Sequence, residues 1–548
     1  MEALEWLGVL AACAAAATGL VARPPRLRAT AMVLALVLVP AVVAGDVWDT
    51  GRFRELRDSP AQLAAAAVIA LVGISVLTAA ILRWPAALPL LAFGVLAFRI
   101  PVELGGETSN LLIPLYLVIA SGTAAAAIAA WTQNQSRGVL SSRSLAIESP
   151  VKMLARSRLR RRGVAARMSL PELAAGILPW LLAGFLVLYA LQSAYSGDLS
   201  KATETVCFFF VPFAVLLALL LEVRWTSNLL TALFAIVFLE GLLFVAVGAW
   251  QFGARELFWN PTVIAGNEVH VYFRVNSLFW DPNVFGRYLI LAALAAAAYM
   301  VWTERSDRAI AAGVGCVVLI AGLTLSFSQS SIFALVAGLI ALVALRWGVR
   351  WALATGAVMA IAAVALVLAA GVEPTSSRSL DVRSSGRVSL ITGGLELAGD
   401  RPAYGYGSGS FQSEFAERHL DVDEPAGGAI SHSEPVTVAA EQGGLGLVVY
   451  GAVVLAGLLT LLGAAPLIPA PRGALVACFV AMVVHSLAYG GFLIDPVTWA
   501  LLGVGLALAR APIPSPLAER VARPAAERTA PARPSLASPG APSSTPGS

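Results

Sequence analysis

The chain has 548 residues, of which 58% are hydrophobic and only 13% are charged. A soluble globular domain has about a quarter of its residues charged, so this composition excludes that class. The apolar residues form many runs of roughly 18–22, each long enough to cross a hydrocarbon core about 30 Å thick as a helix. The sequence therefore predicts an all-α, polytopic integral membrane protein.

These runs predict about 12–15 transmembrane helices and one large external loop that carries short helices. In chain order, the candidate spans are 3–22, 29–45, 61–82, 85–100, 110–131, 171–194, 205–222, 227–250, 284–302, 309–325, 328–345, 351–371, 441–463, 473–490 and 493–509. The four cysteines all fall inside these runs and have no C-x-x-C spacing, so we interpret them as apolar packing residues.

The net charge is only +4, but the positive charges are unevenly distributed. The segment 133–170 has nine Lys or Arg residues against one acid, Glu148, and the positive-inside rule therefore places it in the cytoplasm. Successive spans alternate in direction, and counting them from this segment places three further basic connections inside: 23–28, 303–308 and 346–350. Three connections then face outside: 46–60, 251–283 and 372–440. We expect the basic segment to contact anionic membrane lipids and no nucleic acid, because it has no interleaved aromatic residues.

The pattern divides the chain into six parts. They are N-terminal transmembrane helices (1–132), a basic cytoplasmic loop (133–170), a transmembrane core with the external loop 251–283 (171–371), a large external catalytic loop (372–440), C-terminal transmembrane helices (441–510) and a cytoplasmic tail (511–548). The tail is rich in Pro, Ala, Ser and Arg, and this composition predicts disorder.

The two long external connections contain most of the polar residues. The segment 384–402 predicts an amphipathic helix, and the Gly-rich turn YGYGSGSF follows it. The segment 411–420 predicts a second short helix, and 429–446 leads back into the membrane. A loop as long as 372–440 is usually functional or disordered, and this one has predicted structure.

Several motifs follow one another on the predicted external face. Arg274 precedes D-P-N (281–283) at the start of a span, and S-G-R (385–387) opens the large loop. The turn P-x-x-G-x-G-x-G-x-F (402–411) comes next, and His432 then precedes E-x-G-x-x-G (441–446). In this order the motifs resemble the O-antigen ligase and O-antigen polymerase superfamily over roughly residues 205–510. One expected Arg is absent, because Gln329 stands in its place within LSFSQSS.

The resemblance implies a membrane glycosyltransferase in the cytoplasmic (inner) membrane with its active site facing outside. Such an enzyme moves a glycan from a polyprenyl pyrophosphate carrier to the hydroxyl of a glycan or lipid acceptor, without a metal or other cofactor. Arg274 and Arg387 would hold the pyrophosphate, since guanidinium groups bind phosphate oxygens in pairs. His432 would take the proton of the acceptor hydroxyl. Further substrate contacts are expected from Asn283, Gly405, Gly407, Gly409, Glu441 and His270.

Each of these arginines and histidines also has a purely structural interpretation. Arg274 could end a helix at the membrane interface, and Arg387 could be a solvated loop residue. His432 could be a surface residue of a mobile loop, and His270 could have a structural role.

The remaining motifs have structural interpretations as well. Asp281 with Pro282 is typical of a helix N-cap. The three turn glycines could permit either a close phosphate or simply positive φ angles. The acids of DVDE (421–424) resemble a metal-binding pair, although the resemblance implies a reaction without metal.

Two other functions stay open at this point. A multi-pass transporter or channel would need ionisable residues in the middle of spans, and Glu240 and His485 are the clearest candidates. A peptidoglycan-type glycan polymerase would share the general plan, but its motifs are not evident in the chain. The sequence does not distinguish a ligase from a polymerase, and it does not identify the sugar.

Overall fold

The computed structural model describes residues 2–46, 59–104, 107–132, 168–269, 272–369, 387–418, 431–464 and 469–511. Several predicted features lie outside these residues: nearly all of the basic loop 133–170 and of the tail 511–548, the DVDE motif, His270 and His419. The statements below concern the described residues.

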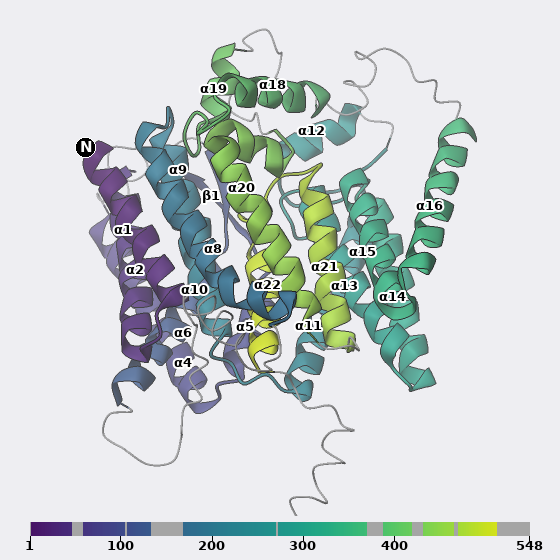
Figure 1. Cartoon of the computed structure of the whole chain (residues 1–548), viewed down its shortest axis with the longest axis horizontal. Coiled ribbons are helices and arrows are strands. Elements are labelled where there is room, and N and C mark those ends of the chain that lie inside the picture. Colours follow the sequence, from purple (N-terminus) through teal and green to yellow (C-terminus); the bar gives the residue numbers. More distant parts are fainter. Residues whose placement is uncertain are drawn as a thin grey trace, which may run out of the picture. The chain divides into compact units, whose positions relative to one another are not determined.

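Helices form almost all of the N-terminal half of the chain (Figure 1). Its elements are α1 (Glu2–Val21), α2 (Pro25–Asp46), α4 (Pro60–Arg83), α5 (Ala87–Val95), the strands β1 (Ile100–Leu104) and β2 (Glu107–Leu111), α6 (Ile113–Thr132), α8 (Leu170–Gln192), a 3-10 turn (Ser193–Tyr195), α9 (Leu199–Thr205), a π-helical turn (Val206–Phe210), α10 (Val211–Leu220), α11 (Ser227–Ala254) and α12 (Pro261–Val269).

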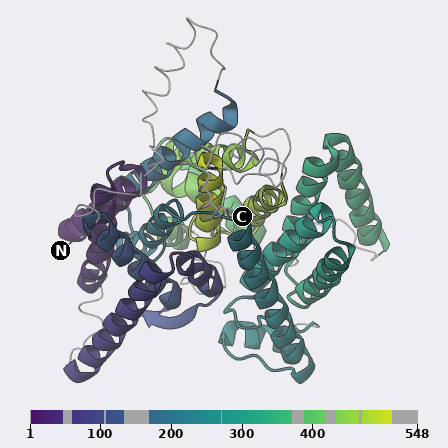
Figure 2. The same ribbon diagram turned by 90° about the horizontal axis from the view of Figure 1, so that it is seen from below.

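The C-terminal half is helical as well. Its elements are α13 (Pro282–Trp302), α14 (Ser306–Leu325), α15 (Gln329–Trp347), α16 (Val349–Ala369), α18 (Arg387–Asp400), α19 (Phe411–Arg418), α20 (Glu434–Leu462), α21 (Ala470–Ser486) and α22 (Pro496–Arg510). Seen from below, α20–α22 lie between the N-terminal helices and the group α13–α16 (Figure 2). The contacts agree with this arrangement, since α20 packs on α8, and α21 packs on α13 and α15.

The structure confirms the predicted all-α, polytopic membrane protein. Among the described residues, 11 helices are long and apolar enough to cross a membrane, and three shorter apolar helices accompany them. The predicted span 85–100 is wrong, because α5 has only 9 residues and is followed by the antiparallel pair β1–β2. Pro101 explains part of this difference, since a proline has no N–H for a helix and disfavours helical geometry in the preceding residue.

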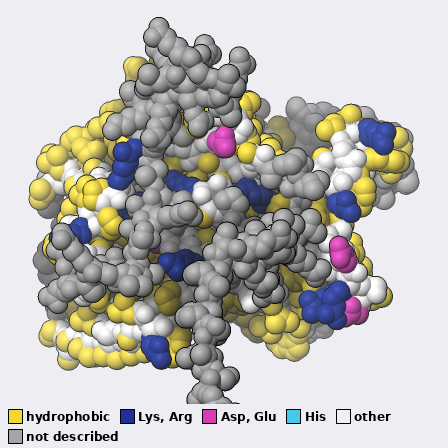
Figure 3. Space-filling view, turned by 60° about the horizontal axis from the view of Figure 1, so that its bottom comes forward, with side chains coloured by type: hydrophobic (Ala, Val, Ile, Leu, Met, Phe, Trp, Pro, Cys, Tyr) yellow, Lys and Arg dark blue, Asp and Glu magenta, His cyan; other side chains and the backbone are white. Residues whose placement is uncertain are grey.

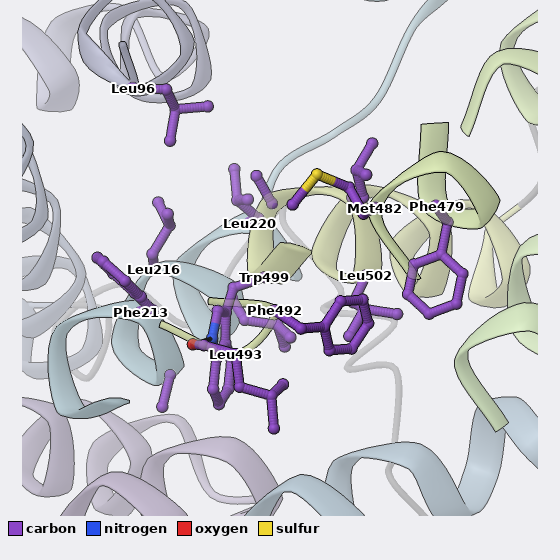
Figure 4. Packing of buried hydrophobic residues seen from close by; sticks show 14 of the residues in the cluster. Leu96, Phe213, Leu216, Leu220, Phe479, Met482, Phe492, Leu493, Trp499 and Leu502 are labelled. Atoms are coloured by element: carbon purple, nitrogen blue, oxygen red, sulfur yellow. Dashed lines mark hydrogen bonds between the residues drawn. The ribbon is translucent and has the colours of Figure 1, made fainter. Parts of the chain in front are cut away.

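The core of the bundle is built around α10, in which all 10 residues are buried. Figure 4 shows Phe213 and Leu216 of α10 beside Trp499 of α22. Trp499 is fully buried, and its indole N–H donates to the carbonyl oxygen of Leu493 at 2.7 Å. A buried indole needs such a partner, and this bond ties the start of α22 to the loop before it.

Three of the short helices lie at one end of the bundle. Figure 1 shows α12, α18 and α19 at the end where the chain begins, opposite the α1–α2 connection. Figure 3 turns the opposite end forward, and Lys and Arg side chains are spread over the part of it that is described. The two helices predicted in the loop 372–440 are confirmed as α18 and α19. The helix α20 begins at Glu434, seven residues before the predicted span 441–463, because Pro435 at its first turn favours helix initiation.

Candidate active site

The D-P-N motif forms the start of α13. The Asp281 carboxylate accepts the backbone N–H groups of Asn283 at 2.6 Å and Val284 at 3.4 Å, and Pro282 occupies the first turn. This confirms the N-cap interpretation of Asp281. The cap fixes the first turn of α13, from which Asn283 and Arg287 project one turn apart on the same face.

Arg287 is the centre of a buried polar network. Its guanidinium group donates to Asp495 Oδ2 at 2.8 Å and lies 3.2–3.3 Å from His485 Nδ1. It also donates to the three carbonyl oxygens of residues 489–491 at 3.0–3.4 Å. A buried guanidinium group is tolerated when its N–H groups have acceptors, and here the loop between α21 and α22 supplies them.

Serine hydroxyls continue the network on the other side of His485. Its Nε2 lies 3.3 Å from Ser330 Oγ and 3.2 Å from Ser331 Oγ, both in the first turn of α15. Ser328, the N-cap of α15, donates to Asn283 Oδ1 at 2.8 Å. We call the following residues the polar cluster: Asn283, Arg287, Ser328, Ser330, Ser331, His485, Tyr489 and Asp495.

His432 lies at one edge of the polar cluster. Its imidazole ring and the Tyr489 ring have centroids 5.8 Å apart, and the Tyr489 ring also contacts His485 with centroids 5.7 Å apart. The Arg287 guanidinium group lies 5.5 Å from the centre of the Tyr489 ring. Tyr489 therefore connects His432 with the buried part of the cluster.

The backbone around His432 is held in a rarely populated conformation. His432 has a φ angle of +55°, in the left-handed region. The Ser431 hydroxyl bridges the turn, because it accepts the Ser433 N–H at 3.0 Å and lies 2.6 Å from Thr437 Oγ1. Strained residues of this kind persist where the surroundings fix them, and they concentrate at functional sites.

Glu434, two residues after His432, ties α20 to the same loop as Arg287. Its Oε2 accepts the backbone N–H groups of Gly491 at 2.7 Å and Phe492 at 3.3 Å. Arg287 holds the carbonyl side of this loop and Glu434 holds the N–H side. The two side chains together fix the position of Tyr489 next to His432.

Tyr489 is a neutral member of this arrangement. Burial raises the pKa of its phenol well above the usual value, and the neighbouring Asp281 carboxylate raises that pKa further. The guanidinium group of Arg287 acts in the opposite direction, but it does not compensate. The phenol therefore keeps its proton at neutral pH and acts through its ring and as a hydrogen-bond donor.

Arg274 lies beside the turn that leads into α15. Its Nε donates to the carbonyl oxygen of Ser326 at 3.1 Å, two residues before the N-cap Ser328. Its backbone is paired with the side chain of Asn267 in α12, through two hydrogen bonds of 2.9 Å. Within the part of the chain that the structure describes, its Nη groups donate to no protein acceptor. Arg274 therefore contacts the turn that leads into α15, where the Ser326 hydroxyl accepts the N–H of Ser328, the donor to Asn283.

The other predicted site residues are placed less directly. Arg387 is the first residue of α18, and this helix packs on α20, where Gly394 faces Val436. Gln329, which replaces the expected Arg, is exposed at the start of α15. A phosphate contact by Arg387 stays a prediction.

The glycine turn packs against α20 near Glu441, a residue of that helix, and the two form a junction. Gly405, Gly407 and Gly409 have φ angles of +67°, +105° and +85°, and backbone atoms of the chain itself occupy the space that a Cβ would need. The N–H groups of Tyr406 and Gly407 donate to the α20 carbonyl oxygens of residues 440 and 441, at 3.0 and 2.8 Å.

Glu441 belongs to this junction too, since its Oε1 accepts the Phe411 N–H at 3.2 Å. The junction lies where α20 is interrupted at Gly443, with φ +64° and ψ −163°. The geometry gives these motif residues a packing role, and substrate contacts by them stay predictions.

Glu240 and His485, the residues considered for a transporter, both have hydrogen-bond partners within the protein. The Tyr288 hydroxyl donates to the Glu240 carboxylate, and His485 belongs to the polar cluster. Among the described residues, no three His, Cys, Asp or Glu side chains lie together as a metal ion would require.

Sequence reasoning missed four residues that build this site: Arg287, Glu434, Tyr489 and Asp495. Arg287 was counted inside the apolar span 284–302, although an ionisable residue within a span is itself a signal of function. The partners of Arg287 lie 198–208 residues away in the sequence, so no local pattern could have identified them.

The comparison with known families agrees with the geometry. The family model described as O-antigen ligase matches residues 314–451, a segment that contains the α15 serines, α18, the glycine turn, His432 and the first half of α20. No curated protein gives a significant match to the chain. The resemblance drawn from the order of the motifs is therefore confirmed over residues 314–451, which are similar to the O-antigen ligase family, and the described helices are those of a multi-pass membrane protein.

Proposed function

We propose that the protein transfers a glycan from a polyprenyl pyrophosphate carrier to an acceptor hydroxyl, as a ligase or polymerase of surface polysaccharide. The reaction would take place at the outer face of the cytoplasmic membrane. The observation that carries the proposal is the polar cluster, which His432 contacts through the Tyr489 ring and which Arg274 approaches through the turn before α15.

The orientation follows from charge. The polar cluster lies at the starts of α13 and α15 and beside the start of α20, the helix on which α18 packs. Figure 3 shows Lys and Arg side chains on the end of the bundle opposite α18. The positive-inside rule assigns the basic end to the cytoplasm. A site at the other end would meet carriers whose glycans are displayed outside.

Arg274 is suited to binding the leaving pyrophosphate. Its Nε bond to Ser326 fixes the guanidinium plane, and its Nη groups are directed to no protein acceptor in the described part of the chain. A fixed cation near the lipid surface stabilises developing phosphate charge more than it would in water. Arg387, at the start of α18, would supply a second cation.

His432 would act as the general base. The acceptor oxygen attacks the anomeric carbon, the bond from that carbon to the pyrophosphate oxygen breaks, and the hydroxyl proton passes to the imidazole. Attack from the side opposite the leaving group inverts the configuration at that carbon. The strained φ of His432 and the surrounding bonds of Ser431, Glu434 and Tyr489 hold the imidazole in one position, which general base catalysis requires.

The test compares His432→Ala with His419→Ala in membranes supplied with a polyprenyl-linked glycan donor. Loss of a general base costs about 10²–10⁴-fold in rate, so the His432 variant should be nearly inactive at equal expression. His419→Ala is the matched control and should keep its transfer rate. Near-normal transfer by His432→Ala would remove this residue from the mechanism.

A further inference from the structure

Arg99 contacts the polar cluster although it comes from the N-terminal part of the chain, far outside the matched residues 314–451. It follows the short helix α5 and directly precedes β1. Its Nη2 lies 3.5 Å from Asp495 Oδ2, the atom that also accepts from Arg287 at 2.8 Å. Two guanidinium groups therefore share one carboxylate oxygen.

Asp495 has its stronger bonds elsewhere. Arg287 makes the shorter contact with Oδ2, and the backbone N–H of Val497 donates to Oδ1 at 2.9 Å. Both oxygens are thus bonded without Arg99. The ion pair with Arg99 is the longest of these contacts, and neither Asp495 nor α22 depends on it for a hydrogen-bond partner.

The side chains of Arg99 and Arg287 also differ in their exposed fraction. The Arg99 side chain is 18% exposed, whereas those of Arg287 and Asp495 are 6% and 4% exposed. A guanidinium group has five N–H donors in a planar fork. Arg99 is thus the accessible cation of the pair, and Arg287 is the one committed to the fold.

The other carboxylates near the cluster are directed to backbone groups. Asp281 accepts the first N–H groups of α13, and Glu434 accepts those of residues 491 and 492. Neither forms an ion pair with an arginine in the described part of the chain. A buried carboxylate that is shared by two cations leaves one of them incompletely paired, and an incoming anion would relieve the cost of that arrangement.

We propose that Arg99 is a further binding residue for the phosphate groups of the donor, an inference that rests on the proposed function. On binding, its guanidinium group would leave Asp495 to Arg287 and bind phosphate oxygens in pairs. The N-terminal segment α5–β1 would then complete a site whose other residues come from the second half of the chain.

The test measures binding without catalysis. Thermal unfolding of the detergent-solubilised full chain is followed with increasing inorganic pyrophosphate, for the wild type, Arg99→Gln and Arg99→Lys. The matched control is Arg305→Gln, which removes an equal charge from an exposed ion pair with Asp307. We expect about tenfold or more weaker pyrophosphate binding for Arg99→Gln, an intermediate value for Arg99→Lys, and wild-type binding for Arg305→Gln.

Arg99→Lys keeps the charge and the ion pair, so the binding test can be made with this variant if Arg99→Gln does not fold. A parallel titration with phosphatidylglycerol micelles identifies the source of the phosphate. An Arg99-dependent shift with that lipid and none with pyrophosphate would assign Arg99 to a lipid headgroup and overturn the inference.

Two outcomes separate the inference from the proposed function. If Arg99→Gln unfolds earlier but binds pyrophosphate as the wild type does, Arg99 is a structural ion-pair residue and the inference fails alone. If the wild type neither binds pyrophosphate nor transfers glycan in membranes, the proposed function fails, and this inference fails with it.

Discussion

The Arg287 guanidinium group and the His485 imidazole ring form a donor–acceptor pair, with Nε and Nη2 3.3 and 3.2 Å from Nδ1. A guanidinium group has N–H donors only, so Nδ1 must accept, and the ring proton must be on Nε2. Nε2 in turn faces the hydroxyls of Ser330 and Ser331. His485 is therefore held through both ring nitrogens within the fold, whereas His432 contacts the polar cluster through the Tyr489 ring.

Replacement of Arg287 by Gln should destabilise the protein strongly. It would leave Asp495 buried without its short ion pair and three loop carbonyl oxygens without donors. Breaking a buried pair from one side costs about 3–5 kcal/mol. Thermal and denaturant unfolding in detergent would measure this loss, and Arg305→Gln, at an exposed pair, should cost no more than about 1 kcal/mol. An equal effect of the two variants would contradict the central role of Arg287.

Glu434→Ala should lower the transfer rate more than it lowers donor affinity. The substitution removes the acceptor of two backbone N–H groups and frees the loop that carries Tyr489. Each unsatisfied N–H costs about 1–3 kcal/mol, and Glu434→Gln should lose less because its amide oxygen still accepts. Steady-state kinetics in membranes would show a fall in kcat with little change in KM. A pure rise in KM would indicate instead that Glu434 contacts the donor.

Some features of this chain are determined by neighbouring residues, and others by contacts between distant ones. Hydropathy was sufficient for most of the spans but not for 85–100, and the D-P-N cap and the helices α18 and α19 followed from patterns within a few residues. The polar network was not predictable in this way, because Arg287 meets Asp495 across 208 residues. The glycine turn was ambiguous in sequence, since positive φ angles serve either a bound phosphate or a packed turn. Only the positions of α20 and of residues 192–202 against that turn show that backbone atoms occupy the space.

Gly443→Ala should impair folding, although glycine is ordinarily a poor helix residue. Its φ of +64° and ψ of −163° lie in a region that only glycine populates readily, and a Cβ there would lie 2.4 Å from the Tyr404 backbone nitrogen. The matched control is Gly451→Ala in the same helix, where nothing lies within 4 Å of the added methyl group. That control should be neutral or more stable by up to about 1 kcal/mol. Yield of monodisperse protein and its melting temperature would distinguish the two, and a tolerated Gly443→Ala would rule out the described interruption of α20.

Tyr489→Phe and Tyr489→Ala should differ sharply in their effect on transfer. Tyr489 contacts His432 and His485 through its ring, and the Arg287 guanidinium group lies over the same ring. Phenylalanine keeps these ring contacts, so that variant should retain most of the wild-type rate. Alanine removes them and leaves His432 without support from this loop, which should lower kcat about tenfold or more, since such ring contacts are each worth about 0.5–1.5 kcal/mol beyond the buried area. The pH dependence of the rate is a second measurement, because a loss of stability alone would not change its shape. The limb that reports His432 should be unchanged in the Phe variant and displaced in the Ala variant, and an unchanged limb in both would show that Tyr489 does not position the imidazole.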